Sequence, residues 1–129
     1  MERREREGII LLDLSGRLVA GEEAATLRDA IKRIAVSPVN VILNMEGVDY
    51  IDSTGLGGMV ICFTSIRKAG GTVKLLNLSR RNIELLVLTK LETVFEVFND
   101  EQDAVNSFFP DRELKKFDIL AFVQSQNKA

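Results

Sequence analysis

The chain has 129 residues, 46% of them hydrophobic and 28% charged, a balance that fits one folded domain and is too apolar for a disordered chain. Its formal net charge of -2 gives no overall positive field with which to hold nucleic acid. It has no histidine and one cysteine, which removes the usual general base, the commonest metal ligand and any internal disulfide. We therefore expect no direct nucleic-acid binding, no metal or cofactor, no enzyme activity, and a buried Cys62.

The N-terminal residues and the length of the apolar runs indicate where in the cell the protein is expected. The chain opens on alternating charges, Met-Glu-Arg-Arg-Glu-Arg-Glu, without the apolar core of a signal peptide. No run reaches the roughly 18 apolar residues that a membrane-spanning helix needs. We expect a cytoplasmic protein without membrane insertion, with disorder confined to its ends.

Apolar runs alternate with helical patterns along the first half of the chain. Residues 9–14 form a short apolar run and predict a strand. Helical spacing over 22–35 predicts an amphipathic helix that ends before Pro38, because the residue preceding a proline is disfavoured in a helix. Residues 39–45 predict a central strand covered on both faces, and residues 56–69 predict a helix that ends at a glycine pair.

The alternation continues in the second half. Residues 73–78 predict a strand, residues 83–94 a helix, residues 95–98 a short last strand and residues 103–109 a closing helix. Strands that alternate with helices need crossover connections, which place parallel strands in one sheet. The fold class is therefore α/β, with a sheet that is at least partly parallel.

The chain divides into a domain over residues 1–109 and a C-terminal extension over residues 110–129. The apolar residues of the extension could form one side of a helix: Leu114, Phe117, Leu120, Ala121 and Val123. Such an apolar stripe favours contact with a surface over a free tail. That surface could be the chain's own domain or the second subunit of a homodimer.

The segment with chemical character is Asp52-Ser53-Thr54-Gly55-Leu56-Gly57-Gly58, where a predicted strand leads into a helix. Sites of open α/β sheets gather at such junctions. Asp52, Ser53 or Thr54 could cap the helix by accepting a hydrogen bond from a free amide of its first turn. The same amides, with the positive end of the helix dipole, would stabilise a phosphate on Ser53 or, as a weaker candidate, on Thr54.

The glycines of this segment need a compensating role. In a helix interior Gly55, Gly57 and Gly58 would each cost about 1 kcal/mol relative to alanine. They could leave a low surface that another protein's backbone approaches closely, or they could let this helix pack near a neighbouring element. They do not form a nucleotide P-loop, since no Gly-Lys-Ser/Thr follows at the required spacing.

These residues resemble the STAS domain family, and especially bacterial anti-sigma factor antagonists controlled by serine phosphorylation. The centre of the resemblance is the string Asp-Ser-Thr-Gly-Leu-Gly at 52–57. The likeness covers Gly8 to Phe109. The other matching segments are Leu14-Ser15-Gly16-Arg17-Leu18, Tyr50-Ile51, Lys74 to Leu78 and Leu88-Thr89-Lys90-Leu91. One departure is Val19, where the family often has an acidic residue.

The resemblance implies a mixed sheet of four to five strands with helices packed mainly on one face. It places the family's phosphorylated serine on Ser53, and it implies a partner-binding surface formed by residues 52–58 and Leu18. In such antagonists the unphosphorylated form binds an anti-sigma factor that is also a serine kinase, so the sigma factor is released, and phosphorylation breaks that complex. A serine phosphatase is the second partner implied.

Two other interpretations stay open. The chain could be a STAS scaffold or a transport-complex subunit in which Ser53 is never phosphorylated. It could also be an enzyme, with Asp49 and Asp52 as paired catalytic carboxylates, or a receiver domain, which needs carboxylates clustered at strand ends to hold magnesium. In the predicted strands Asp13, Asp49 and Asp52 form no such cluster, and we interpret Asp49 as a turn residue and Asp52 as a helix cap.

Overall fold

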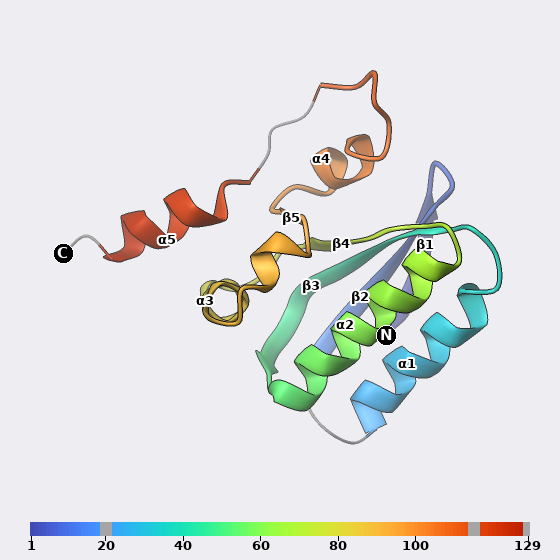
Figure 1. The fold of residues 1–129 in the computed structure, drawn as a ribbon, viewed down its shortest axis with the longest axis horizontal. Helices are drawn as coiled ribbons and strands as arrows, with labels where there is room; N and C mark the ends of the chain where they lie inside the picture. Colours follow the sequence, from blue (N-terminus) through green and yellow to red (C-terminus); the bar gives the residue numbers. More distant parts are fainter. Residues whose placement is uncertain (19–21, 114–116, 128–129) are drawn as a thin grey trace.

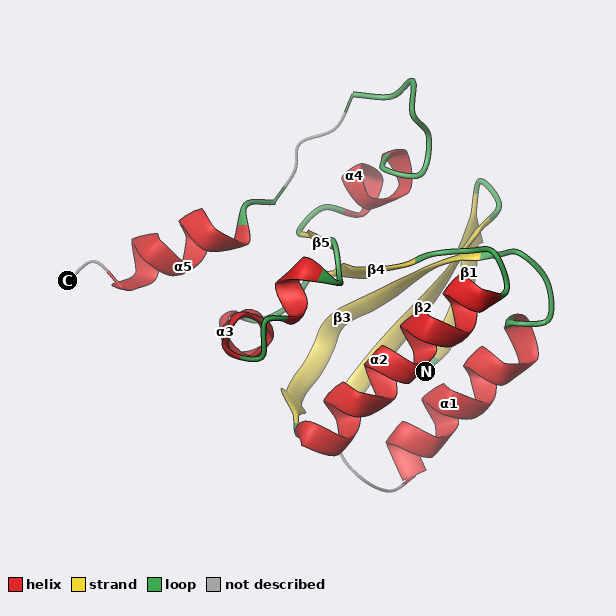
Figure 2. Cartoon of the chain, in the orientation of Figure 1, coloured by secondary structure: helices red, strands yellow, loops and turns green. Residues whose placement is uncertain are grey.

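One mixed sheet forms the centre of the protein in a computed structural model, which describes residues 1–18, 22–113 and 117–127. In chain order its elements are β1 (Glu2–Arg6), β2 (Ile9–Leu18), α1 (Glu22–Ile34), β3 (Asn40–Ile51), α2 (Ser53–Lys68), β4 (Val73–Leu76), α3 (Arg80–Leu88), the short 3-10 helix η1 (Leu91–Thr93), β5 (Val97–Phe98), α4 (Glu101–Asn106) and α5 (Ile119–Asn127). Figures 1 and 2 show α1 and α2 side by side across the sheet, with α5 on the side of α3, away from α1.

The five strands lie in the order β1-β2-β3-β4-β5. Strand β1 pairs antiparallel with β2, and every other neighbouring pair is parallel. Helices α1, α2 and α3 cover one face, and α4 covers part of the other. The predicted α/β class, the mixed sheet and the arrangement of helices mainly on one face are confirmed.

The sheet has a hydrophobic core on each face, because side chains along each strand point alternately to the two faces. In β2, Ile10 and Leu12 point to the α1–α2 face, whereas Ile9 and Leu11 point to the α4 face, because successive strand side chains point to opposite sides of a sheet. All four are at most 5% exposed. This is why the strand appears in the sequence as a continuous apolar run.

Strand β1 was not predicted, because Glu2–Arg6 contains no apolar residue. Its backbone nevertheless forms a hairpin with β2. The connecting residues Glu7 and Gly8 have φ values of 52° and 82°, the left-handed pair that a two-residue hairpin turn requires. A charged strand is well suited to this position, since it blocks further pairing at the sheet edge.

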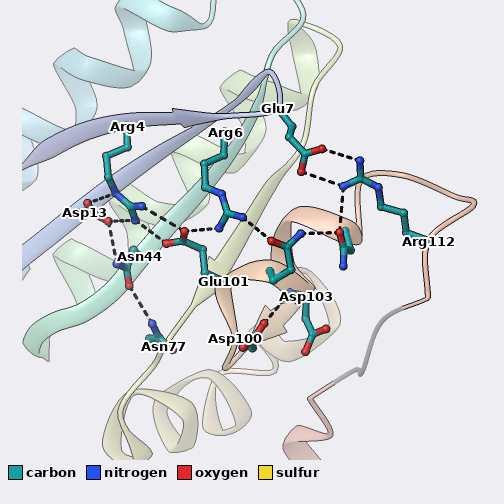
Figure 3. Close-up of polar contacts among 12 residues, drawn as sticks. Arg4, Arg6, Glu7, Asp13, Asn44, Asn77, Asp100, Glu101, Asp103 and Arg112 are labelled. Atoms are coloured by element: carbon teal, nitrogen blue, oxygen red, sulfur yellow. Dashed lines mark hydrogen bonds and ion pairs between the residues drawn. The ribbon is translucent and has the colours of Figure 1, made fainter.

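Ion pairs join this hairpin to α4 on the second face of the sheet (Figure 3). The Arg4 guanidinium donates to Asp13 at 2.6 Å and to Glu101 at 2.7 Å, and Arg6 donates to Glu101 at 2.5 Å. Asn44 also donates to Asp13, at 2.8 Å. The bonds from Arg4 hold the pKa of Asp13 and that of Glu101 below their usual ranges.

Several boundaries differ from the predictions. Strand β3 continues to Ile51 because irregular pairing with β2 carries the ladder past Gly47. The prediction of Asp49 as a turn residue is therefore wrong, since it is an exposed residue of that strand. Helix α2 begins at Ser53, earlier than the predicted start at residue 56.

The predicted helix over 83–94 is two elements. Helix α3 begins at Arg80, because the Ser79 side chain accepts a hydrogen bond from the Asn82 amide. It ends at Leu88, and η1 follows after Lys90, whose φ of 61° is left-handed and incompatible with a continuous helix. Strand β5 is shorter than predicted, and α4 begins earlier than predicted.

Helix α5 lies in the extension. Its first residue, Ile119, is 9% exposed and belongs to the main core, against which Phe117, Phe122 and Val123 also pack. In this structure the extension therefore packs on its own domain, and the homodimer stays a prediction. Within the described ranges, no helix has the length and apolar character needed to cross a membrane.

Candidate functional site

The junction of β3 and α2 is organised by Asp52. Its backbone is extended, with φ of -97°, and its Oδ1 accepts a hydrogen bond from the Gly55 amide at 2.7 Å. Its carbonyl oxygen accepts from the Leu56 amide at 2.8 Å. Asp52 is therefore the helix cap, as predicted, and neither Ser53 nor Thr54 is needed for that role.

Ser53 and Thr54 are the first two residues of α2, and both are exposed. Among the described residues, the side-chain hydrogen bond at this helix start is made by Asp52, and none is found for the hydroxyl of Ser53 or Thr54. Ser53 thus presents an exposed hydroxyl group at the positive end of a helix. Phosphorylation of Ser53 would therefore break no capping hydrogen bond, since Asp52 makes that bond.

The glycines of the segment divide into two kinds. Gly55 is buried, as is Leu56, which is 7% exposed and faces the core. Gly57 is exposed and Gly58 is half-buried, and a Cβ atom added to either would meet no described heavy atom within 4 Å beyond the nearby backbone of its own helix. Close packing of α2 on a neighbouring element therefore does not explain Gly57 and Gly58. They leave a low, open surface beside Ser53.

A shallow groove of about 460 Å³ runs from the start of α2 to α3. Asp52 and Ser53 line it from one side, and Arg81, Leu85 and Leu88 line it from α3. Leu88 is 82% exposed and adds apolar surface to the groove. The groove therefore places the apolar side chains of Leu85 and Leu88 on the wall opposite Ser53, a polar residue that could be phosphorylated.

Two arginines lie at this end of the sheet. The guanidinium carbon of Arg81 lies 4.3 Å from the centroid of the Tyr50 ring, and that of Arg17 lies 5.1 Å from it, both within cation–π range. Neither has an ion-pair partner within the described part of the chain, whereas the neighbouring Arg80 pairs with Glu84 at 3.1 Å.

Sequence reasoning missed Arg17, Tyr50 and Arg81 as members of this site. They come from β2, β3 and α3, which are brought together because the carboxyl ends of parallel strands meet at one edge of the sheet. No spacing in the sequence marks them. Leu18 ends β2, where its backbone pairs with Ile51, and Val19 lies outside the described residues.

The aspartates considered for other chemistries lie apart from one another. Asp13 is bound to Arg4 on the opposite face of the sheet, Asp49 is exposed on β3 and Asp52 is the helix cap, so the three do not form a cluster. The described residues contain no group of three or more His, Cys, Asp or Glu side chains that could hold a metal. Cys62 is 1% exposed, and burial raises the pKa of its thiol to about 11, which makes it unreactive.

The chain is similar in sequence to known proteins. Residues 1–104 match the model of the STAS domain. The anti-sigma-B factor antagonist of Bacillus subtilis is 36% identical over 83 residues, which cover 61% of this chain and 76% of that protein.

Two solved structures share the fold at low sequence identity. An anti-sigma-factor antagonist (STAS) domain protein from Planctomyces limnophilus has a TM-score of 0.72 at 20% identity, over 82% of this chain and 95% of that one. The Bacillus cell fate determinant SpoIIAA, in its phosphorylated form, has a TM-score of 0.66 at 18% identity, over 83% of this chain and 97% of that one.

Proposed function

The chain belongs to the STAS domain family, and from that premise we propose that it is an anti-sigma factor antagonist. It binds an anti-sigma factor that is also a serine kinase, and phosphorylation of Ser53 breaks the complex. The protein thereby regulates transcription that depends on a sigma factor. It acts in the cytoplasm as a binding protein, with ATP bound by the kinase, and a serine phosphatase restores the active form.

The main support for this proposal is that Asp52 caps the helix, which leaves the Ser53 hydroxyl exposed. Asp52 accepts the hydrogen bond from the Gly55 amide, so the helix stays capped whatever happens to Ser53. The Ser53 hydroxyl is exposed at the helix start, where a kinase can reach it. The dipole of a 16-residue helix favours a negative group at that end.

The open surface beside Ser53 explains how a phosphate would break the complex. With no Cβ at Gly57 and room around Gly58, a partner's backbone can approach α2 closely. A phosphate adds a charge of about -1.5 to -2 at neutral pH. Inside a close interface, beside the carboxylate of Asp52, that charge would be poorly solvated and would repel an acidic partner surface.

Two similar proteins support the proposal. The Bacillus subtilis relative is an anti-sigma-B factor antagonist. SpoIIAA, of the same fold, exists in a phosphorylated form. The first is consistent with the proposed antagonist role, and the second with control of such a fold by phosphorylation.

The test is the mass of the protein isolated from its own host in growing and in stressed cells. One phosphate adds about 80 Da, and fragmentation should locate it on Ser53. Ser53→Ala should abolish the addition, whereas the matched control Thr54→Ala should keep it. An unmodified protein in both conditions would favour the scaffold or transport-complex interpretation, and a phosphate on Thr54 alone would move the switch by one residue.

A further inference from the structure

A second cavity, of about 440 Å³, lies between η1, β5 and the start of α5. It shares no lining residue with the groove beside Ser53. One of its walls, Phe117 to Leu120, lies outside residues 1–104, over which the family model matches. The cavity is therefore a feature of this chain's extension as well as of its domain.

The inner walls are aromatic and apolar. Phe95, which is 1% exposed and belongs to the main core, lines the cavity together with Phe117. Phe98, which is 3% exposed, lines it from β5, with its side chain in the core on the α4 face. The Phe95 ring packs edge-on against Phe63 at 5.3 Å, and the Phe117 ring lies 5.5 Å from that of Phe122. The volume falls within the range of about 300 to 1,000 Å³ that is usual for small-molecule sites.

The polar lining of the cavity includes three carboxylates. Glu96 pairs with Lys74 at 2.8 Å, and Asp118 accepts a hydrogen bond from the Ala121 amide at 3.0 Å. Glu92 differs from them, since its Oε2 is buried and has no hydrogen-bond partner among the described residues. A buried carboxylate oxygen without a donor is costly, and a charged donor would relieve that cost.

We propose that this cavity binds an amphipathic organic ammonium ion. The apolar body of the ligand lies among the phenylalanines, and its amino group donates a hydrogen bond to Glu92. The faces of aromatic rings attract cations, so the phenylalanine lining and the carboxylates favour the same charge. An anionic ligand of the same shape is excluded by Glu92, Glu96 and Asp118. The proposal is independent of the switch at Ser53.

The test is a titration of the full-length, ¹⁵N-labelled chain followed by NMR, with three probes that share a phenyl ring. They are 2-phenylethylammonium, the neutral 2-phenylethanol and the anionic 3-phenylpropionate. The ammonium ion should cause saturable shifts of the amides at 92–98 and 117–120. Its affinity should exceed that of the alcohol about tenfold, the worth of one charge-assisted hydrogen bond, and the carboxylate should not bind.

Two variants isolate the role of Glu92. Glu92→Gln should weaken binding of the ammonium ion about tenfold and leave that of the alcohol unchanged. Glu84→Gln removes the same charge from α3, outside the cavity lining, and should change neither. Equal affinity for ammonium ion and alcohol, an unaffected Glu92→Gln variant, or shifts confined to other residues would each overturn the proposal. Shifts at 117–120 that depend on protein concentration without any probe would assign the cavity to a second copy of the chain instead.

Discussion

Two regions of this molecule hold arginines close to its surface, and they use them differently. At the corner between β1 and α4, Arg4 and Arg6 are matched by Asp13 and Glu101 (Figure 3). Beside Ser53, Arg81 lies over an aromatic ring without a carboxylate partner among the described residues. Paired charges hold the first region together, whereas unpaired charges in the second are available to another molecule. Stability and binding should therefore respond to different substitutions.

The largest effect is expected at Ser53. Ser53→Asp places a permanent negative charge in the proposed interface, where an unpaired buried charge should weaken binding of the anti-sigma factor kinase about a hundredfold. The free energy of unfolding should stay within about 0.5 kcal/mol of wild type, because the residue is exposed. Titration calorimetry and urea unfolding measure the two quantities. The control Thr64→Asp lies further along α2 and should bind normally; equal losses in both variants would contradict a local role for Ser53.

The next effect concerns stability rather than binding. Arg4→Gln leaves Asp13 and Glu101 without their common partner, and we expect it to lower the free energy of unfolding by about 1 to 2 kcal/mol. The estimate is modest because the Arg4 side chain is 38% exposed. Arg81→Gln removes the same charge at the groove and should change stability by less than about 0.5 kcal/mol. If both variants lost equal stability, the distinction between paired and unpaired arginines would fail.

Gly57→Ala should raise the stability of the protein and lower its affinity for the partner. The added Cβ meets nothing within 4 Å, so the helix should gain up to about 1 kcal/mol. Partner affinity should nevertheless fall, because the methyl group stands on the surface that the partner approaches. Gly71→Ala is the contrasting control, since its Cβ would lie 1.6 Å from the Val39 carbonyl oxygen, and it should destabilise the fold. A Gly57→Ala variant with unchanged affinity would place the partner elsewhere on the molecule.

The smallest effect is a dependence of stability on acidity. Asp13 and Glu101 have lowered pKa values in the folded protein, so their contribution is complete above the ordinary carboxyl values of about 4. It is lost as the pH falls through the lowered values. Thermal unfolding between pH 7 and pH 3 should show this decline, and Arg4→Gln should show a shallower one. Parallel curves for the two proteins would mean that other carboxylates are responsible.

Much of the fold could be predicted because its signals are local. The apolar run at 9–14 and the helical spacing at 22–35 are both found in the structure as β2 and α1, since each pattern reports the burial of neighbouring residues. The charged strand β1 was missed because its pairing depends on backbone hydrogen bonds and not on apolar side chains. The error at Asp49 arose because irregular pairing prolongs β3 beyond the apolar residues that identify it.

The candidate site shows the same division. The sequence by itself determined that Asp52 and Ser53 stand where a strand leads into a helix, because capping depends on atoms only a few residues apart. Only the tertiary structure placed Arg81 of α3 over the Tyr50 ring, beside the groove that Ser53 lines. It also brought Arg4 to Glu101, 97 positions along the chain. The path of the chain through the sheet determines which distant residues come close together in space, and no local sequence pattern encodes that path.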